Sequence, residues 1–359
     1  MMKYKTGAVA SPGGRTRGGV AMRVLDLITG SGRAVRGRRG WPMELASTRL
    51  VEERDVRGFD TGMFIDHVHR QGTINLALPG QAESGSDGVQ TVGEAVWRQW
   101  EDSVAQAERM VCTCTIDEAG AGAGVPRIAT TFRAVGKAER RDLDKLATDV
   151  SLRIPELYDH ADAMGLRARP MSAEDVGSAV HRALTGYAGR FDSLDRVHWE
   201  SFNEQVVVSS PPPGPVSAAE HAAGGDVGWS SRRCVVMSAD TSDPSVAGVV
   251  DQIMTDWEDL DEVSGSALVR RTRFFRPFVL PEGTGEDLAT GQGRRWAVLT
   301  VVGDQAADAV LRRAVDLVPE VGLKVRRRRG LQRTGLLSGV GAGVCGWQHT
   351  AGADRIGRA

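Results

Sequence analysis

The sequence predicts an α+β protein built from two copies of one pattern of strands and helices. The clearest copy includes 294–330, where an apolar strand, an amphipathic helix and a returning strand follow one another. A helical crossover between two strands of one sheet makes those strands parallel. With strands expected at 232–240 and 266–275, this gives the split β-α-β order of a ferredoxin-like domain, in which helices cover one face of an antiparallel sheet.

The first half of the chain carries the same order of elements, about 150 to 170 residues earlier. Strands are expected at 111–116, 126–135 and 166–170. A long helix at 138–164 should join the last two of them, with a bend at Pro155. The predicted fold is therefore α+β, with two tandem ferredoxin-like domains.

Composition shifts indicate the boundaries of these domains. The start is rich in Gly and Arg, whereas the stretch after 172 opens with a helix, contains the run PPPGP and is typical of a linker. The predicted parts are a basic, disordered segment at 1–46, a first domain with its capping helix at 47–185, a linker at 186–230, a second domain at 231–345 and a flexible tail at 346–359.

The basic start differs from the rest of the chain in charge. The net charge of the chain is −1, yet its first 50 residues hold ten Lys or Arg and only two acidic residues. An apolar patch at 20–28 would suit an anionic membrane surface, and a disordered or mis-started N-terminus is the alternative. The chain has no apolar run of the roughly 18 to 20 residues that a membrane-spanning helix needs. Four scattered cysteines fit a reducing cytoplasm.

A glycine motif near the C-terminus matches a dinucleotide-binding loop only in its spacing. Gly341, Gly343 and Gly346 spell G-x-G-x-x-G, but no preceding strand, following helix or later acidic residue stands where such a site needs them. The sequence contains no G-x-S-x-G elbow and no G-x-x-x-x-G-K-[ST] loop. We therefore predict no cofactor and no catalytic residues.

Two pairs of metal-ligating residue types stand two positions apart on expected strands. His67 and His69 could face one metal ion, and Cys112 and Cys114 form a similar pair. Neither pair has a third ligand with fitting spacing. We therefore interpret the histidines as a solvated strand face and the cysteines as packing residues, and we predict no metal site.

Basic residues are concentrated on two strands of the expected second domain. Such a face could bind an acidic partner, an anionic lipid surface or nucleic-acid phosphates. RNA-binding sheets of this topology stack bases on aromatic residues of their central strands, and no matching aromatic pattern is present. Nucleic-acid binding is therefore the less favoured hypothesis. The predicted interaction residues are Arg270, Arg271, Arg273, Lys324, Arg326, Arg327, Arg328 and Arg329.

The stretch from Thr130 to Val180 resembles a known family of membrane components. These are the EccE-like proteins of actinobacterial type VII secretion and their relatives in conjugative elements. The resemblance is carried by the order strand, long helix, strand and capped helix, and by the motif GLRARPMS at 165–172. The closing segment GLKVRRRRGLQRTGLL is also similar to the end of family members, with their helical insert reduced here to 281–293. The resemblance covers about 71–344.

The resemblance implies a role in assembly. We expect a non-enzymatic structural subunit of an actinobacterial secretion or conjugative DNA-transfer apparatus, in the cytoplasm and peripheral to the inner membrane. Its expected partners are ATPase and channel subunits, with an anionic membrane surface as a further contact. Family members carry N-terminal membrane-spanning helices, and this chain has its basic start in their place, so it is either truncated there or a peripheral version held by partners. The alternatives are a nucleic-acid-binding protein that uses the basic sheet, and an enzyme whose site is assembled from distant residues.

Overall fold

The computed structural model describes this chain in segments. They are residues 44–79, 94–105, 109–120, 123–185, 189–201, 206–209, 229–238, 268–277, 293–303, 309, 324–327 and 332–345. The chain divides into two compact units, Met1–Ala34 and Val35–Ala359, and all described residues belong to the second. The predicted apolar patch at 20–28 lies outside the described residues.

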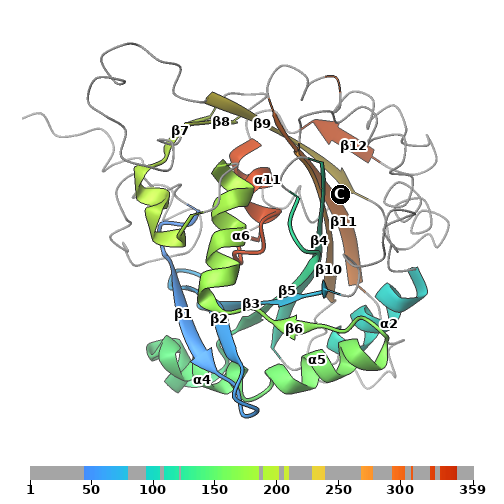
Figure 1. The fold of residues 1–359 in the computed structure, drawn as a ribbon. Coiled ribbons are helices and arrows are strands. Elements are labelled where there is room, and N and C mark those ends of the chain that lie inside the picture. The colour runs from blue at the N-terminus through green and yellow to red at the C-terminus, as the bar shows by residue number, and fades with distance from the viewer. Residues whose placement is uncertain are drawn as a thin grey trace, which may run out of the picture. The chain divides into compact units, whose positions relative to one another are not determined.

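All 12 described strands belong to one sheet, and each pairing within it is antiparallel. Neighbouring strands follow the order β1-β2-β3-β5-β4-β10-β11-β9-β8-β7, while β6 pairs with β3 and β12 pairs with β9 (Figure 1). The strands are β1 Thr48–Arg54, β2 Asp60–Asp66, β3 Gln71–Ala77, β4 Met110–Gly120, β5 Arg127–Arg133, β6 Arg169–Pro170, β7 His198–Ser201, β8 Val206–Ser209, β9 Trp229–Ser238, β10 Leu268–Pro277, β11 Gly293–Gly303 and β12 Lys324–Arg327.

The prediction of two tandem ferredoxin-like domains is wrong, because the sheet does not stop between the two halves of the chain. Strand β4 of the first half pairs with β10 of the second over eight residue pairs, from Gly120 opposite Leu268 to Thr113 opposite Phe275. Strand patterns in a sequence show which residues extend, but they do not show which open edges meet. Pairing these two edges removes the unpaired backbone groups that separate domains would each expose there.

The order of strands repeats itself about the pairing of β4 with β10. Strands β1-β2-β3-β5-β4 lead to the middle of the sheet, and β7-β8-β9-β11-β10 lead to it from the other end in the same relative order. The short strand β6 lies beside β3 as β12 lies beside β9. We refer to residues 48–170 as the first repeat and to residues 198–327 as the second repeat.

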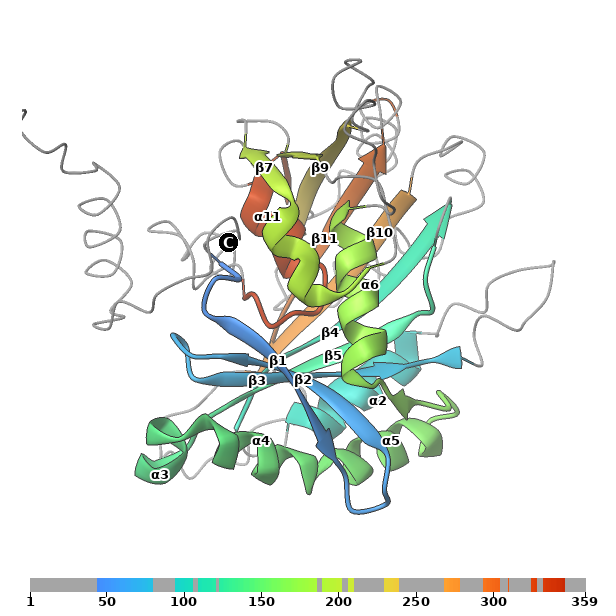
Figure 2. The same ribbon diagram turned by 60° about the vertical axis from the view of Figure 1, so that its left-hand side comes forward.

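Helices cover both faces of the sheet, and not one face as predicted. Neighbouring residues of β2 show this, because Met63 and Ile65 pack with helices α2, α4 and α5, whereas Phe64 between them packs with α6 and α11. Each group of helices thus closes its own hydrophobic core (Figure 2). The described helices are α2 Glu94–Ala105, α3 Gly136–Arg141, α4 Leu143–Ser151, α5 Ile154–Ala163, α6 Ala173–Thr185, the 3-10 helix η2 Phe191–Arg196 and α11 Gln332–Ser338.

The single bent helix expected at 138–164 is three helices. Asp142 separates α3 from α4, and its carboxylate accepts a hydrogen bond from the backbone N–H of Asp144 at the start of α4. Pro155 lies in the first turn of α5, where a missing N–H leaves no hydrogen bond unmade. Pro155 therefore helps to start a new helix and does not bend a continuous one.

The chain after β6 begins as predicted and then differs. Ser172 caps α6, since its hydroxyl accepts a hydrogen bond from the backbone N–H of Asp175 at 3.1 Å. The segment at 186–230, expected as a linker, contains η2 and the two strands β7 and β8, which extend the sheet. After residue 331, the described residues form α11 and the turn that follows it.

That final turn explains two glycines of the G-x-G-x-x-G motif. Gly341 and Gly343 have φ angles of 75° and 79°, in the left-handed region that favours glycine. A Cβ atom at Gly341 would lie 2.7 Å from both Asn75 Oδ1 and Ile116 Cδ1. The backbone passes this closely because Asn75 donates a hydrogen bond to the Gly341 carbonyl. These glycines therefore fit the C-terminal turn against strands of the first repeat.

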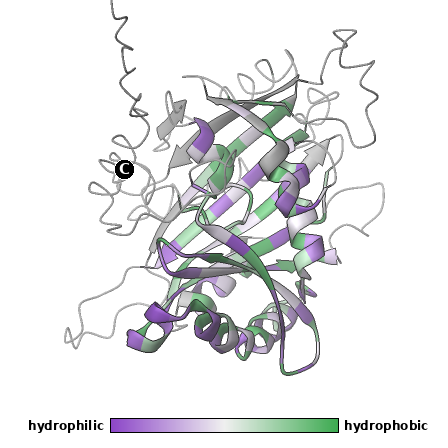
Figure 3. Ribbon diagram, turned by 90° about the vertical axis from the view of Figure 1, so that its left-hand side faces the viewer, coloured by the Kyte–Doolittle hydropathy of each residue, from purple (hydrophilic) through white to green (hydrophobic). Residues whose placement is uncertain are grey.

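Hydrophobic and hydrophilic residues both occur along the strands, as Figure 3 shows, and β2 places the apolar residues Met63, Phe64 and Ile65 next to one another. The exposed residues of α2, α4, α5 and α6 are mainly polar, in keeping with burial of one face of each of these helices. Among the residues that the structure describes, no helix has the length and the apolar composition needed to cross a bilayer.

Candidate functional site

Charged residues line the pairing of β4 with β10, where the two repeats meet. Arg270 lies opposite Glu118, and its Nε donates to Glu118 Oε1 at 2.8 Å. The next pair points to the other face of the sheet, where Arg271 Nη2 donates to Asp117 Oδ2 at 2.7 Å. We call these four residues the ionic seam. Opposite charges directly across an antiparallel pair favour this register over its neighbours, because a slip by one residue would separate both pairs.

Two of the predicted interaction residues, Arg270 and Arg271, belong to the ionic seam, and a third, Arg273, pairs with a residue of α2. Arg273 Nη2 lies 3.5 Å from Glu101 Oε1 of α2, and both side chains are more than nine-tenths buried. Arg270 is fully buried and Arg271 is 4% exposed. The sequence shows these arginines on one strand but does not show the carboxylates that fold against them. At these three positions the structure therefore has internal ion pairs in place of an open basic face.

The remaining predicted interaction residues lie at or beyond the end of the second repeat. Lys324, Arg326 and Arg327 belong to β12, whose backbone pairs with β9 from Lys324 opposite Ser238 to Arg327 opposite Val235. Arg328 and Arg329 lie outside the described residues.

Two arginines that the sequence analysis missed, one buried and one half-buried, lie in the same part of the fold. Arg127 of β5 is 1% exposed, and Arg182 of α6 approaches Glu118. Burial alone would raise the pKa of Glu118, but Arg270, Arg127 and Arg182 together hold that pKa below its usual value. One carboxylate thus faces three guanidinium groups. The three arginines are far apart in the sequence, so the sequence did not show that they lie together with the glutamate in the fold.

The histidine and cysteine pairs have structural partners. His69 Nδ1 lies 2.6 Å from Asp66 Oδ2 in the turn between β2 and β3. Cys112 and Cys114 are buried in a hydrophobic cluster that also holds Cys345, and burial raises the pKa of Cys114 to about 12. Among the described residues, no group of three or more His, Cys, Asp or Glu side chains is placed to hold a metal ion.

A second candidate site lies at the turn between β1 and β2, which we call the hairpin tip (residues 55–59). Asp55 Oδ1 accepts hydrogen bonds from the backbone N–H groups of Arg57 and Phe59, at 2.8 and 2.9 Å. The other oxygen, Oδ2, accepts a hydrogen bond from the Tyr158 hydroxyl at 3.1 Å. Asp55 is 5% exposed, so one buried carboxylate organises the whole turn.

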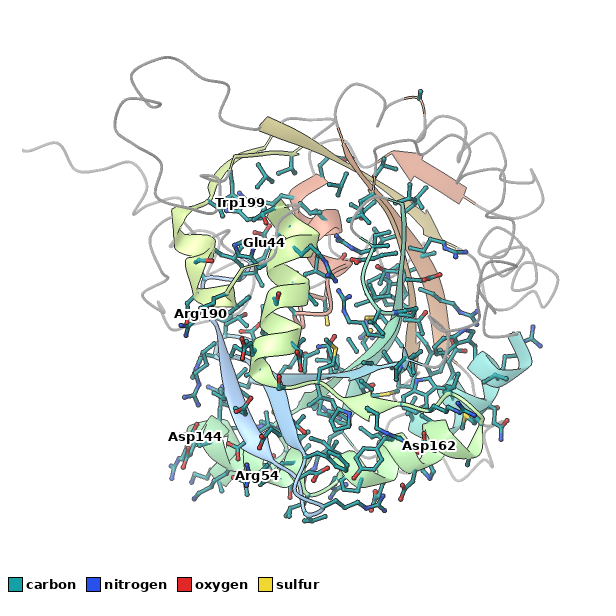
Figure 4. All side chains as sticks on the ribbon, in the orientation of Figure 1. Glu44, Arg54, Asp144, Asp162, Arg190 and Trp199 are labelled. Atoms are coloured by element: carbon teal, nitrogen blue, oxygen red, sulfur yellow. The ribbon has the colours of Figure 1, made fainter. Side chains whose placement is uncertain are left out.

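Residues of helix α5 bind the Arg57 side chain of the hairpin tip. Arg57 donates two hydrogen bonds to Asp159, at 2.7 and 2.6 Å, and its guanidinium lies over the ring of Tyr158. The pKa of Asp159 is lowered by its hydrogen bonds with Arg57. Phe59 meets Tyr158 edge to face, with ring centroids 6.1 Å apart. In Figure 2 the turn of this hairpin reaches past α4 and α5, and Figure 4 labels Arg54 at its base.

The hairpin tip presents apolar side chains to solvent although its backbone is fixed. Val56 is 65% exposed and Phe59 is 47% exposed. They are two of the four large hydrophobic side chains that are exposed among the described residues; Val125 and Leu152 are the others. A pre-organised apolar protrusion loses little conformational entropy on binding, which suits contact with a protein. The segment DVRGFD between two strands contains these apolar residues, but the sequence alone does not distinguish it from an ordinary hairpin turn.

Comparisons with known proteins give little information about this chain. No family model matches it, and no curated protein matches it. Among solved structures, it matches 6-hydroxy-D-nicotine oxidase from Arthrobacter nicotinovorans with a TM-score of 0.28 and 14% identity. The match covers 78% of this chain and 52% of the oxidase, so the chain spans about half of that protein's length.

The prediction that the chain is not an enzyme is withdrawn, because it rested only on the absence of catalytic motifs from the sequence. A TM-score of 0.28 is too low to assign a fold, a cofactor or a reaction to this chain.

Proposed function

We propose that this protein is an assembly subunit of an actinobacterial secretion or conjugative DNA-transfer apparatus. It would act at the cytoplasmic side of the inner membrane by docking to the ATPase or channel subunits of that apparatus. The similarity of 130–180 to EccE-like proteins supports the kind of apparatus. The proposal leaves open whether the chain also has an enzymatic activity.

The observation that carries the docking role is the hairpin tip. The Asp55 carboxylate fixes its backbone, and two residues of α5 hold its side chains: the Tyr158 hydroxyl binds Asp55 and the Asp159 carboxylate binds Arg57. Exposing Val56 and Phe59 costs free energy in an isolated protein, since each would be more stable buried. Rigid, exposed apolar residues at a loop between strands are typical of protein contact sites. The expected partner is therefore a subunit with an apolar depression that accepts both side chains.

The nucleic-acid alternative has lost part of its support. It relied on basic strand residues, and three of these, Arg270, Arg271 and Arg273, are buried beside carboxylates. Guanidinium groups in internal ion pairs do not offer charge to a phosphate backbone at the surface.

Cross-linking in the cells that produce the protein tests the proposal. A photo-reactive residue at position 56 should cross-link to an ATPase or channel subunit encoded beside this protein, in the membrane fraction. Val56→Asp combined with Phe59→Asp should reduce recovery of that subunit at least tenfold, because two carboxylates would enter an apolar contact.

Leu152→Asp is the matched control, because Leu152 is 56% exposed but lies outside the hairpin tip. It should leave recovery unchanged. Recovery of the protein as a free species in the soluble fraction, with no cross-link from position 56, would contradict the proposal. An equal loss of the partner in the Leu152 variant would show that general surface hydrophobicity, and not the hairpin tip, holds it.

A further inference from the structure

Three arginines and one glutamate form a cluster on the face of the sheet beneath α6. Arg127 comes from β5, Arg182 from α6, Arg270 from β10 and Glu118 from β4 (Figure 1). We call this set the arginine cluster. Guanidinium groups stay protonated in proteins, so the cluster carries three positive charges and one negative charge.

Both oxygens of the Glu118 carboxylate already accept hydrogen bonds. Glu118 Oε1 accepts from Arg270, and Oε2 accepts from the backbone N–H of Gly124 at 3.1 Å, with Arg182 Nη2 3.9 Å away. Neutral carbonyl oxygens supply the other acceptors. Arg270 Nη2 donates to the Ala183 carbonyl at 2.6 Å, and Arg127 Nη2 donates to the Val340 carbonyl at 3.3 Å.

The three guanidinium groups have more N–H donors than these acceptors bind. Each arginine keeps one buried nitrogen without a hydrogen-bond partner among the described residues: Nε of Arg127, Nε of Arg182 and Nη1 of Arg270. The Ala183 carbonyl lies in the last turn of α6, where the helix dipole supplies a negative partial charge of about half a unit. Among the described groups, more than one positive charge therefore remains uncompensated, and burial makes the charges of Arg127 and Arg270 costly.

We propose that the arginine cluster binds a small oxyanion of the phosphate class. Such an ion offers several acceptor oxygens in the arrangement that guanidinium groups favour, and it would neutralise the surplus charge. Arg127 and Arg270 are at most 1% exposed, which favours a free ion over a phosphate group attached to a larger molecule. The accessible side of the cluster is formed by Arg182, whose side chain is 28% exposed, and by the neighbouring loop at 123–126, where Val125 is 44% exposed.

The thermal midpoint of unfolding of the purified full chain tests this proposal. Inorganic phosphate at about 10 mM should raise the Tm by about 3 °C or more relative to sodium chloride at the same ionic strength, because it binds only the folded state. Adenosine monophosphate at the same concentration should raise the Tm by less than 1 °C. No rise with phosphate, or an equal rise with chloride, would overturn the proposal. A rise with the nucleotide alone would also overturn it.

Two arginine variants test whether phosphate binds at the arginine cluster. Arg182→Met removes one positive charge at the exposed side of the cluster, and it should weaken phosphate binding at least tenfold by calorimetry. Arg333→Met is the matched control, because the Arg333 side chain is 32% exposed and pairs with one glutamate, Glu44, elsewhere in the fold. It should bind phosphate as the unchanged protein does. Equal binding by Arg182→Met and the unchanged protein would exclude the cluster, and far-UV circular dichroism checks that both variants fold.

Discussion

Strand β4 has two neighbours, and the two ladders differ in chemistry. Towards β5, in its own repeat, β4 places Cys112 opposite Thr131, Thr113 opposite Thr130 and Cys114 opposite Ala129. Towards β10, in the other repeat, it places Glu118 and Asp117 opposite Arg270 and Arg271. The first ladder is thus mainly small and neutral, and the second contains the ionic seam.

This difference follows from what each ladder must specify. Only residues 121–126 separate β4 from β5, so the connection restricts which registers can form. Residues 121–267 separate β4 from β10, so the side chains must select both the partner strand and its register. Buried opposite charges suit that task, since a wrong partner or a slipped register leaves charges unpaired at high cost. We infer that the ionic seam contributes specificity to the joining of the repeats.

Removal of Glu118 should produce the largest loss of stability. Glu118→Leu leaves Arg127, Arg182 and Arg270 without a carboxylate, and we expect the free energy of unfolding to fall by about 3 to 5 kcal/mol. Urea denaturation followed by circular dichroism measures this. Because the folded state lowers the pKa of Glu118, its stabilising effect is present above the usual glutamate pKa and is lost as the pH falls through the lower folded value. The variant should therefore lose less stability than the unchanged protein on acidification below about pH 4.5.

A substitution at the C-terminal turn should have the next largest effect. Gly341→Ala puts a side chain at a φ of 75° and into contact with Asn75 and Ile116, and it should cost about 2 to 4 kcal/mol. Gly58→Ala is the matched control. Its φ is 88°, but no atom lies within 4 Å of the added Cβ, so backbone strain alone should cost about 1 kcal/mol. Equal losses in the two variants would show that the turn does not pack tightly on the first repeat.

A double-mutant cycle on the second pair of the seam should show a smaller effect. Alanine at Asp117, at Arg271 and at both should give a coupling energy of about 1 to 2 kcal/mol, because the two side chains are 30% and 5% exposed. The comparison pair is Arg54 and Asp60 on the hairpin of β1 and β2, where the side chains are 70% and 46% exposed. Water screens that pair, so its coupling should lie within experimental error of zero. A stronger coupling in the exposed pair would contradict our account of the seam.

Local patterns in the sequence predicted individual strands well. The apolar strand expected at the start of 294–330 is β11, which spans Gly293–Gly303, and the strand expected at 111–116 is β4, which spans Met110–Gly120. A run of apolar and β-branched residues depends only on neighbours in the sequence, so it predicts a strand without knowledge of the strand's partners. The pairing of β4 with β10 depends on contacts between distant residues, so the sequence pattern gave two domains where the structure has one sheet.

The candidate sites were less predictable for the same reason. Arg270 looked like part of a basic face, because the carboxylate of Glu118 that neutralises it stands far away in the sequence. Arg127 and Arg182 gave no signal, since neither belongs to a run of basic residues. The hairpin tip was not predicted, because the exposure of Val56 and Phe59 depends on the contacts of α5 with Asp55 and Arg57.

A disulfide across the seam tests most directly whether the two repeats form one sheet. Cysteines at the directly opposite positions 117 and 271 should form an intramolecular disulfide in the monomer, which peptide mapping under non-reducing conditions detects. Cysteines at 117 and 272 should not, because neighbouring residues of a strand point to opposite faces. A disulfide in the first variant and none in the second would confirm both the pairing and its register. Absence of the disulfide between 117 and 271 in the folded monomer would contradict the single sheet.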